Sequence, residues 1–407
     1  MNRAKLLAAA MLLAALTLAA CNDDGAPPAL SPTVSPPTQT PGPTQTSTRQ
    51  VLAAPGPKLV YLRGIDTDYA LAGELRIATL DGTLTAPVSP IGGDAVFAGY
   101  AGGVLYYVTF LDGTGRTLWA LDPEVEQLQP LFSFRGGHDF DAYASVSPDG
   151  RYIAYTDVDS VYLFDVATGE SRLLLQGNTP ACDTGPGECF GYRDLQWSPD
   201  GALLLVHKVF YEGGRPVLVD PFAAEPAEIV ADTPGSVRPR AWAPDSAAFC
   251  GTESYGGTGL YVARPPDWQL HDLLPGYALP TGPVGDPERY IQSCDWLAAD
   301  TIAFATVIAR YPEPITRTAP TLFSIEVSVH LLTTSETRTV ATIEADDQVT
   351  TPVAFALPGG ESVLAAYFHG PLGAAGTPAQ PVIVNVSTGE RVPVLAEGDW
   401  VVAVLPP

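Results

Sequence analysis

The chain has 407 residues, 46% of them hydrophobic, and its 45 acidic residues against 21 basic ones give a net charge of −24. So acidic a surface argues against nucleic-acid binding and against electrostatic attachment to anionic lipid. The charge is compatible with basic partners, divalent cations or simple solubility. The 39 glycines and 40 prolines favour short strands joined by turns.

The first twenty residues are typical of a secretory signal. Arg3 and Lys5 precede an apolar run, residues 6–18, that is too short to cross a bilayer. The run ends in Leu-Ala-Ala-Cys21, which resembles the bacterial lipobox, so Cys21 is expected to become the lipid-modified N-terminus. We predict a lipoprotein signal peptide over 1–20 and export to the outer face of the cytoplasmic membrane or to the outer membrane.

A linker follows over residues 21–54. Between Asp23 and Gln50 the chain consists mainly of Pro, Thr, Ser, Gly and Ala, with too few large apolar residues to form a core. We expect a disordered tether there, and one globular domain over 55–407.

Short apolar runs separated by turn residues begin directly after the linker. The first predicted strands are Lys58–Arg63, Glu74–Leu80 and Thr83–Val88. Further along, Ser147-Pro148-Asp149-Gly150 is a tight-turn sequence, and the β-branched and aromatic runs 152–155 and 161–164 have the length of strands. Residues 146–175 therefore form an antiparallel meander that cannot be stable alone.

Copies of this meander recur along the chain. The turn that ends in Pro-Asp-Gly returns, exactly or in altered form, at Trp197, Trp242, Trp296 and Phe355. The strand pair that follows begins at Leu75, Leu118, Val161, Val217, Leu260, Val329 and Val382. Three of the six intervals are 43 residues long, within the range of about 40–45 residues for a propeller blade. Seven copies predict an all-β fold, a seven-bladed β-propeller of four-stranded antiparallel blades.

The first blade lacks a clear innermost strand, whereas the chain ends in an unassigned apolar run. We predict that Trp400–Leu405 supplies that strand and closes the ring.

The motifs "WSPDG" and "LFDVATGE" resemble the WD40-like (PD40) propeller repeat of the TolB type, over roughly residues 55–407. The resemblance implies a propeller fold. It says little about function, because that family includes scaffolds, ligand binders and propeller domains of peptidases.

Four cysteines remain besides Cys21, an even number in an exported chain. We expect Cys182 to pair with Cys189 across a long loop. Cys250, in the second strand of the fifth blade, can meet Cys294, in the inner strand of the sixth; the alternative is two buried free thiols.

The Ser-Pro-Asp-Gly and Thr-Gly-Glu turns fall on one face of such a propeller and the long insertions on the other. Elaborated loops on a rigid scaffold are where binding residues usually lie. Their tyrosines form the candidate binding face: Tyr192, Tyr211, Tyr255, Tyr277, Tyr290 and Tyr311.

Signals of catalysis are poor. The chain has no Gly-x-Ser-x-Gly elbow and no His-Glu-x-x-His motif. A divalent cation is a lesser alternative at two acidic clusters, formed by Asp66, Asp68, His138, Asp139 and Asp141. The turn residues Asp149, Asp200 and Asp245 are repeated, which indicates a structural role.

We therefore expect a membrane-anchored, monomeric module without a cofactor that recognises an envelope protein or extracellular ligand noncovalently. Two alternatives stay open: an enzyme, a hydrolase or lyase with its site at the channel mouth, and a subunit of an envelope assembly machinery.

Overall fold

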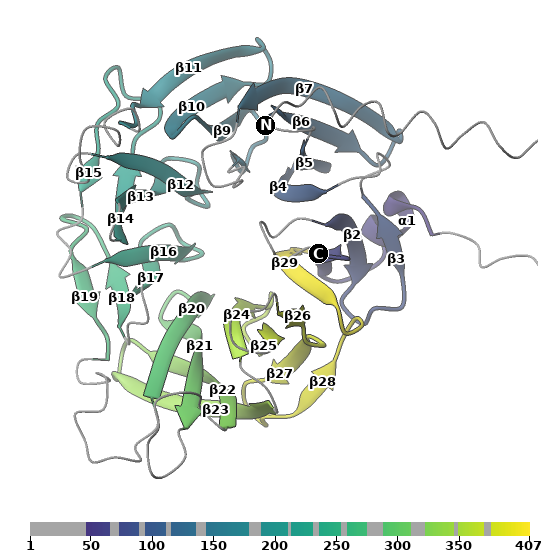
Figure 1. Cartoon of the computed structure of the whole chain (residues 1–407), viewed down its shortest axis with the longest axis vertical. Coiled ribbons are helices and arrows are strands. Elements are labelled where there is room, and N and C mark those ends of the chain that lie inside the picture. Colours follow the sequence, from purple (N-terminus) through teal and green to yellow (C-terminus); the bar gives the residue numbers. More distant parts are fainter. Residues whose placement is uncertain are drawn as a thin grey trace, which may run out of the picture. The chain divides into compact units, whose positions relative to one another are not determined.

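The computed structural model describes residues 46–65, 73–88, 94–110, 115–135, 144–178, 189–210, 213–230, 236–253, 259–274, 288–310, 322–345, 349–369 and 376–407. Those residues form one short helix, α1 (Thr48–Ala53), and seven antiparallel sheets arranged in a ring (Figure 1). The prediction of a seven-bladed β-propeller is confirmed. Among the described residues, no helix has the length and apolar character needed to span a membrane.

The blades are numbered along the chain, and the strands of each are named from the innermost outward. Blade 1 contains β29 (Asp399–Leu405), β1 (Lys58–Arg63), β2 (Glu74–Thr79) and β3 (Thr85–Pro87). Blade 2 contains β4 (Ala95–Ala101), β5 (Val104–Phe110), β6 (Gly115–Asp122) and β7 (Gln127–Arg135). Blade 3 contains β8 (Ala144–Val146), β9 (Tyr152–Asp157), β10 (Ser160–Asp165) and β11 (Glu170–Leu175).

The remaining four blades repeat this order. Blade 4 contains β12 (Phe190–Trp197), β13 (Leu204–Phe210), β14 (Gly213–Val219) and β15 (Ile229–Val230). Blade 5 contains β16 (Val237–Trp242), β17 (Phe249–Glu253), β18 (Leu260–Ala263) and β19 (Leu270–Asp272). Blade 6 contains β20 (Glu288–Ala298), β21 (Thr301–Arg310), β22 (Leu322–Leu331) and β23 (Glu336–Ala345). Blade 7 contains β24 (Val349–Ala356), β25 (Ser362–His369), β27 (Val382–Asn385) and β28 (Arg391–Pro393), and β26 (Thr377–Pro378) also pairs with β25.

Burial follows the position of a strand within its blade. In the second strand β21, the residues from Ile302 to Ala309 are all buried, because each face of a blade packs against a neighbouring blade. The outermost strand β11 is exposed over its first four residues and buried only at Leu174 and Leu175. Second strands therefore consist largely of buried apolar residues, whereas an outer strand such as β11 turns most of its residues to solvent.

The C-terminal strand closes the ring as predicted. β29 pairs antiparallel with β1, from Lys58 opposite Leu405 to Arg63 opposite Asp399, so it begins one residue earlier than expected. The guanidinium of Arg63 donates two hydrogen bonds to the buried Asp399 carboxylate, at 2.7 and 2.8 Å. Trp400 packs against Phe368 of blade 7, with ring centroids 4.2 Å apart. The closure thus joins two segments from opposite ends of the domain.

The repeated Ser-Pro-Asp-Gly turns are structural. In blade 3, Asp149 Oδ1 accepts hydrogen bonds from Ser147 Oγ (2.6 Å) and from the backbone N–H of Arg151 (3.1 Å). Gly150 has a φ of 71°, a conformation that glycine adopts without steric cost. The turn of blade 4 repeats the arrangement around Asp200.

The tryptophans before these turns connect successive blades. Trp197 Nε1 donates to the Ser145 carbonyl (3.0 Å), Trp242 to Gln196 (3.3 Å) and Trp296 to Ala241 (3.2 Å). Each acceptor lies on the inner strand of the preceding blade, so the repeated Trp fixes the spacing of neighbouring inner strands.

Two further connections tie the domain together. Cys250 of β17 and Cys294 of β20 form a disulfide between blades 5 and 6, so this predicted pairing is confirmed. Helix α1 lies within the segment whose composition indicates linker. It begins with a capping box at Ser47, and Val51 is fully buried against blade 1. One well-placed apolar residue is enough to dock it, which a compositional argument over a polar segment does not detect.

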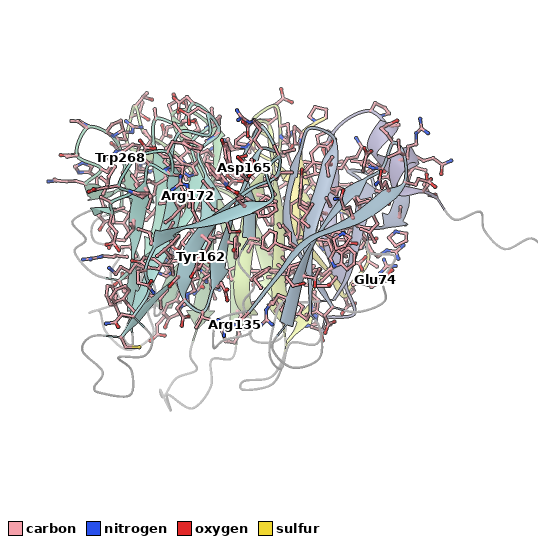
Figure 2. The ribbon with its side chains drawn as sticks, turned by 90° about the horizontal axis from the view of Figure 1, so that it is seen from above. Glu74, Arg135, Tyr162, Asp165, Arg172 and Trp268 are labelled. Carbon is pink, nitrogen blue, oxygen red and sulfur yellow. A yellow bond between two sulfur atoms is a disulfide. The ribbon has the colours of Figure 1, made fainter. Side chains whose placement is uncertain are left out.

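The two faces of the propeller differ in their connections. The turn face carries the connections between first and second strands and between third and fourth strands. Figure 2 shows Asp165 and Trp268 at this face and Arg135, which ends β7, at the opposite one. The opposite face, here called the loop face, carries the other connections of the blades, and most residues of the expected insertions lie outside the described ranges.

Candidate functional site

Two of the six tyrosines predicted to form a binding face are described, and both have polar partners. Tyr192 is 4% exposed, and its hydroxyl donates a hydrogen bond to Glu228. Tyr290 is half-buried on β20, and its hydroxyl donates to Glu288. Tyr211, Tyr255, Tyr277 and Tyr311 lie outside the described residues, so a binding face built from them stays a prediction.

Other predicted positions are also outside the described ranges. These are the candidate cation ligands Asp66, Asp68, His138, Asp139 and Asp141. Among the described residues, no group of three or more His, Cys, Asp or Glu side chains is placed to hold a metal ion. Cys189 is disulfide-bonded, and Cys182, its expected partner, lies outside the described residues.

A different group of charged residues meets on the inner strands of blades 4 and 5. It consists of Arg193 and Asp194 on β12 and Arg238 and Arg240 on β16, and we call it the arginine cluster. Each strand contains an irregularity at this point, between Arg193 and Gln196 in β12 and between Pro239 and Ala241 in β16. Asp194 has a φ of 53°, in the left-handed region. Such bulges redirect side chains, and here they bring residues of two blades together.

Asp194 is the anionic member of the cluster. Its carboxylate accepts two hydrogen bonds from Arg238, at 2.7 and 2.8 Å, and its Oδ2 lies 3.2 Å from Nδ1 of His207. Burial raises the pKa of this carboxyl, but the charge of Arg238 and the bonds from His207 and Arg238 outweigh burial and hold the pKa well below its usual range. Asp194 is therefore ionised, and its carboxylate is already bonded to Arg238 and His207.

His207 completes this inner arrangement as a neutral side chain. Burial lowers its pKa more than the neighbouring Asp194 raises it, and the charges of Arg238 and Arg193 lower it further. The second ring nitrogen, Nε2, is buried and has no hydrogen-bond partner among the described residues. It faces Gly214, where even a Cβ atom would lie 2.2 Å from Nε2. The backbone thus closes this side of the imidazole, and no substrate can reach it there.

Two arginines of the cluster lack an anionic partner among the described residues. Arg240 Nε donates to Thr252 Oγ1 (2.9 Å), its one hydrogen bond within that part of the chain. Burial and the charge of Arg238 lower the pKa of Arg240 to about 9. Arg193 pairs in register with His207, and its Nε is buried with no hydrogen-bond partner in the described ranges. The cluster thus contains three guanidiniums and one carboxylate, and only Arg238 is hydrogen-bonded to that carboxylate among the described residues.

Guanidinium groups in such a setting bind anions. Their planar donors match the geometry of a carboxylate or phosphate, and hydrogen bonds between charged partners are stronger than neutral ones. The side chain of Arg238 is 41% exposed, so solvent reaches the cluster. The arrangement can hold an anion between two blades.

The sequence repeat contains one feature that could have predicted part of the arginine cluster. Arg193 and Arg238 occupy the same position, four residues before Trp197 and Trp242. Aligning the copies on these tryptophans places both arginines on adjacent inner strands. Arg240 has no such signal, because the bulge in β16 decides its direction.

No protein-family model matches the chain, and no curated protein matches it. Many solved structures resemble it. They include the periplasmic gluconolactonase of Pseudomonas aeruginosa, with a TM-score of 0.56 and 16% identity over 86% of this chain and 99% of that one. The oligogalacturonate lyase of Vibrio parahaemolyticus has a TM-score of 0.50 and 11% identity over 84% and 85%.

TolB from Acinetobacter baumannii is also similar, with a TM-score of 0.45 and 13% identity over 72% of this chain and 64% of TolB. The likeness to these proteins is one of fold. At this level of identity, it does not extend to their activities.

Proposed function

We propose that this protein is a noncovalent recognition module that binds an anionic ligand at the arginine cluster. The observation that carries the proposal is the pair of partly buried guanidiniums, Arg193 and Arg240, that lack an anionic partner among the described residues. A buried charge without a partner is unfavourable, and a bound anion would remove that penalty.

The surroundings of the cluster favour binding over catalysis. Asp194 is held by Arg238 and His207, and the free nitrogen of His207 is covered by Gly214. Neither group is placed to take a proton from a ligand at Arg240. The described part of the cluster therefore offers positive charge and hydrogen-bond donors without a general base.

The proposal includes the cellular setting expected from the N-terminus. Lipid on Cys21 and the tether that follows would hold the module at a membrane of the cell envelope, outside the cytoplasm. The ligand there would be an acidic small molecule, or an acidic group on an envelope protein, and the arginine cluster would bind either through the same carboxylate or phosphate chemistry.

Titration calorimetry on the full chain tests the proposal. The probes are inorganic phosphate and galacturonate, the latter because one fold neighbour is an oligogalacturonate lyase. We expect Arg240→Gln and Arg193→Gln each to weaken binding by about tenfold or more, the value of a lost charge-assisted hydrogen bond. The control is Arg135→Gln, which replaces an exposed arginine on β7 and should leave the affinity for both probes unchanged.

Two results would count against the proposal. One is the absence of binding by either probe at low ionic strength. The other is equal affinity in the parent, Arg240→Gln and Arg193→Gln, which would place the bound anion elsewhere on the molecule.

A further inference from the structure

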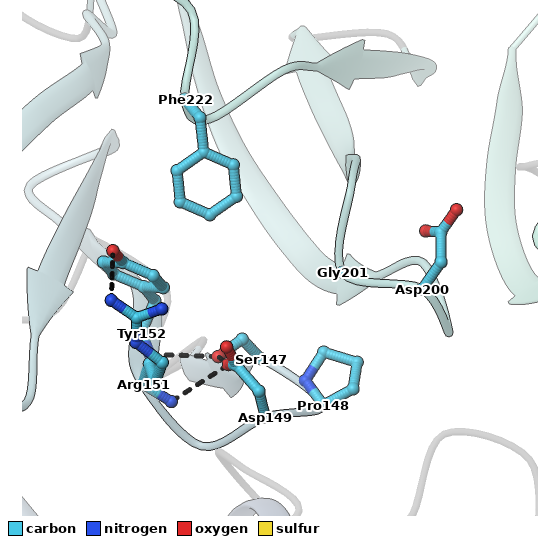
Figure 3. Close-up of a pocket in the computed structure, with 8 residues that line it drawn as sticks. All are labelled: Ser147, Pro148, Asp149, Arg151, Tyr152, Asp200, Gly201 and Phe222. Atoms are coloured by element: carbon cyan, nitrogen blue, oxygen red, sulfur yellow. Dashed lines mark hydrogen bonds between the residues drawn. The ribbon is translucent and has the colours of Figure 1, made fainter.

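A hollow of about 410 Å³ opens on the turn face between blades 3 and 4. Its base is formed where the turns of the two blades meet, since a Cβ atom on Gly201 would lie 3.6 Å from Pro148 Cδ. Asp149, Arg151, Tyr152, Asp200 and Phe222 surround the space above (Figure 3). The hollow lies on the turn face, where the inner strands β8 and β12 end, and it shares no residue with the arginine cluster.

Two carboxylates of the hollow are ionised. A hydrogen bond from Ser147 lowers the pKa of Asp149, and a hydrogen bond from Ser198 lowers that of Asp200. Ser147 and Ser198 each donate to Oδ1 of the neighbouring aspartate at 2.6 Å, and a hydrogen bond with the Ser246 side chain lowers the pKa of Asp200 further. A carboxylate offers about four lone-pair sites, so both groups can still accept hydrogen bonds from a ligand.

Among the described residues, only one of these carboxylates has a positive charge acting on it. The guanidinium of Arg151 contributes to the lowered pKa of Asp149, which shows that the two charges interact. Asp200 has hydrogen-bond donors around it but no cationic partner among the described residues. The hollow therefore carries one uncompensated negative charge, and the acidity of the whole chain adds to its negative potential.

Aromatic rings form the other side of the hollow. Phe222 is 50% exposed, yet its place is set by its backbone N–H, which donates to Asp220 (2.8 Å), and by Arg172, which donates to the Pro221 carbonyl. Its ring packs edge-on against the Tyr152 ring, with the two centroids 5.1 Å apart. The guanidinium of Arg151 already lies over the Tyr152 ring, 5.3 Å from its centroid. A cation is thus held against this aromatic group within the protein itself.

We infer that the hollow binds an organic cation, an ammonium or guanidinium group carried on a short alkyl stem. The charged end would pair with Asp200, and the stem would cover the exposed ring of Phe222. Such a group occurs both in free amines and in the lysine and arginine side chains of proteins. This inference is independent of the anionic ligand proposed for the arginine cluster.

The test is a titration of the full chain, followed by NMR or calorimetry, with three probes. Agmatine represents a free cation, acetyl-Gly-Arg-Gly-amide represents a protein side chain, and sorbitol is a neutral polyol. We expect agmatine to bind with a dissociation constant on the order of 1 mM. Tighter binding of the peptide than of agmatine would identify a protein partner as the source, and the reverse would identify a free amine.

Three variants and one control make the test specific. Asp200→Asn keeps the turn acceptor but removes the charge, and Phe222→Ala removes the ring; each should weaken agmatine binding by about fivefold. Arg151→Gln removes the internal cation and should strengthen binding by about twofold. Asp81→Asn changes a turn aspartate of blade 1 that also accepts a 2.6 Å bond, from Thr79, and should have no effect.

Binding of sorbitol without binding of agmatine would overturn the inference. So would agmatine binding that is unchanged in both Asp200→Asn and Phe222→Ala, or weakened equally by Asp81→Asn.

Discussion

Asp295, on the inner strand β20, is a carboxyl group whose surroundings disfavour its charge. Its two oxygens accept hydrogen bonds from the backbone N–H groups of Trp296 and Ala356, both at 2.8 Å. Burial raises the pKa of Asp295 to about 6, although these two bonds lower it. Asp194, also on an inner strand, shows the opposite result because Arg238 supplies a full positive charge beside it. Both carboxyl groups are buried, so the presence of a cationic partner decides which of the two has a lowered pKa.

This raised pKa predicts a pH dependence of stability. Between the unfolded pKa of about 3.9 and the folded value, the folded state binds more protons than the unfolded chain. The contribution of Asp295 to the free energy of unfolding is therefore greatest below pH 4 and is lost as the pH rises through about 6. We expect Asp295→Asn to gain stability relative to the parent over that range, on the order of 1–3 kcal/mol.

Urea unfolding of the parent and of Asp295→Asn at several pH values measures this difference. Taking the difference between the two proteins removes the contributions of groups such as His207, whose lowered pKa makes stability fall as the pH falls below about 6.5. A difference that is constant from pH 4 to 8 would show that the pKa of Asp295 is not raised.

At the scale of strands and turns, adjacent blades are joined at regular places. The indole of each repeated Trp reaches the inner strand before it, and Ser293 and Asp295 of β20 accept backbone N–H groups of β24. The disulfide between Cys250 and Cys294 adds a covalent link where blade 5 meets blade 6. Most of these contacts lie near the inner strands, where the blades converge.

The disulfide predicts a measurable loss of stability when it is removed. The two cysteines are 44 residues apart, and closing such a loop stabilises the folded state by about 2–4 kcal/mol. Cys250→Ala/Cys294→Ala should therefore unfold at a lower urea concentration than the parent. Adding a reductant to both proteins should shrink the difference, because the parent then loses the same bridge. An unchanged midpoint in the double variant would contradict the prediction.

For the whole molecule, ring closure rests on a short terminal strand. β29 provides all of the innermost strand of blade 1, and Asp399 is 1% exposed beneath Arg63. Trp400 also fills the space between blades 1 and 7. Without β29, the first blade would expose a strand edge and its apolar face to water.

Truncation before residue 399 should consequently lower the melting temperature and broaden the transition, because the open ring no longer unfolds as one unit. Removing only Pro406 and Pro407, which follow β29 and are exposed, is the matched control and should leave melting unchanged. Thermal melting followed by circular dichroism compares the three chains. If the chain that ends at residue 398 melts like the parent, the C-terminal strand does not stabilise the ring.

Local patterns in the chain determined the number of blades, the strands of blade 1 and the closure by the C-terminal strand. Turn residues and apolar runs are short-range signals, and their repetition counts the blades whatever the packing between them. Only the tertiary structure showed which charged and aromatic residues lie together in the two candidate sites. Arg238 of blade 5 meets Asp194 of blade 4 because the ring sets the inner strands of the two blades side by side, and both strands have register shifts at this point. Tyr192 is covered by packing between blades, and Phe222 reaches the turns of blade 3 from a connection in blade 4. Contacts between residues far apart in the chain depend on distance in space, which a repeat pattern does not contain.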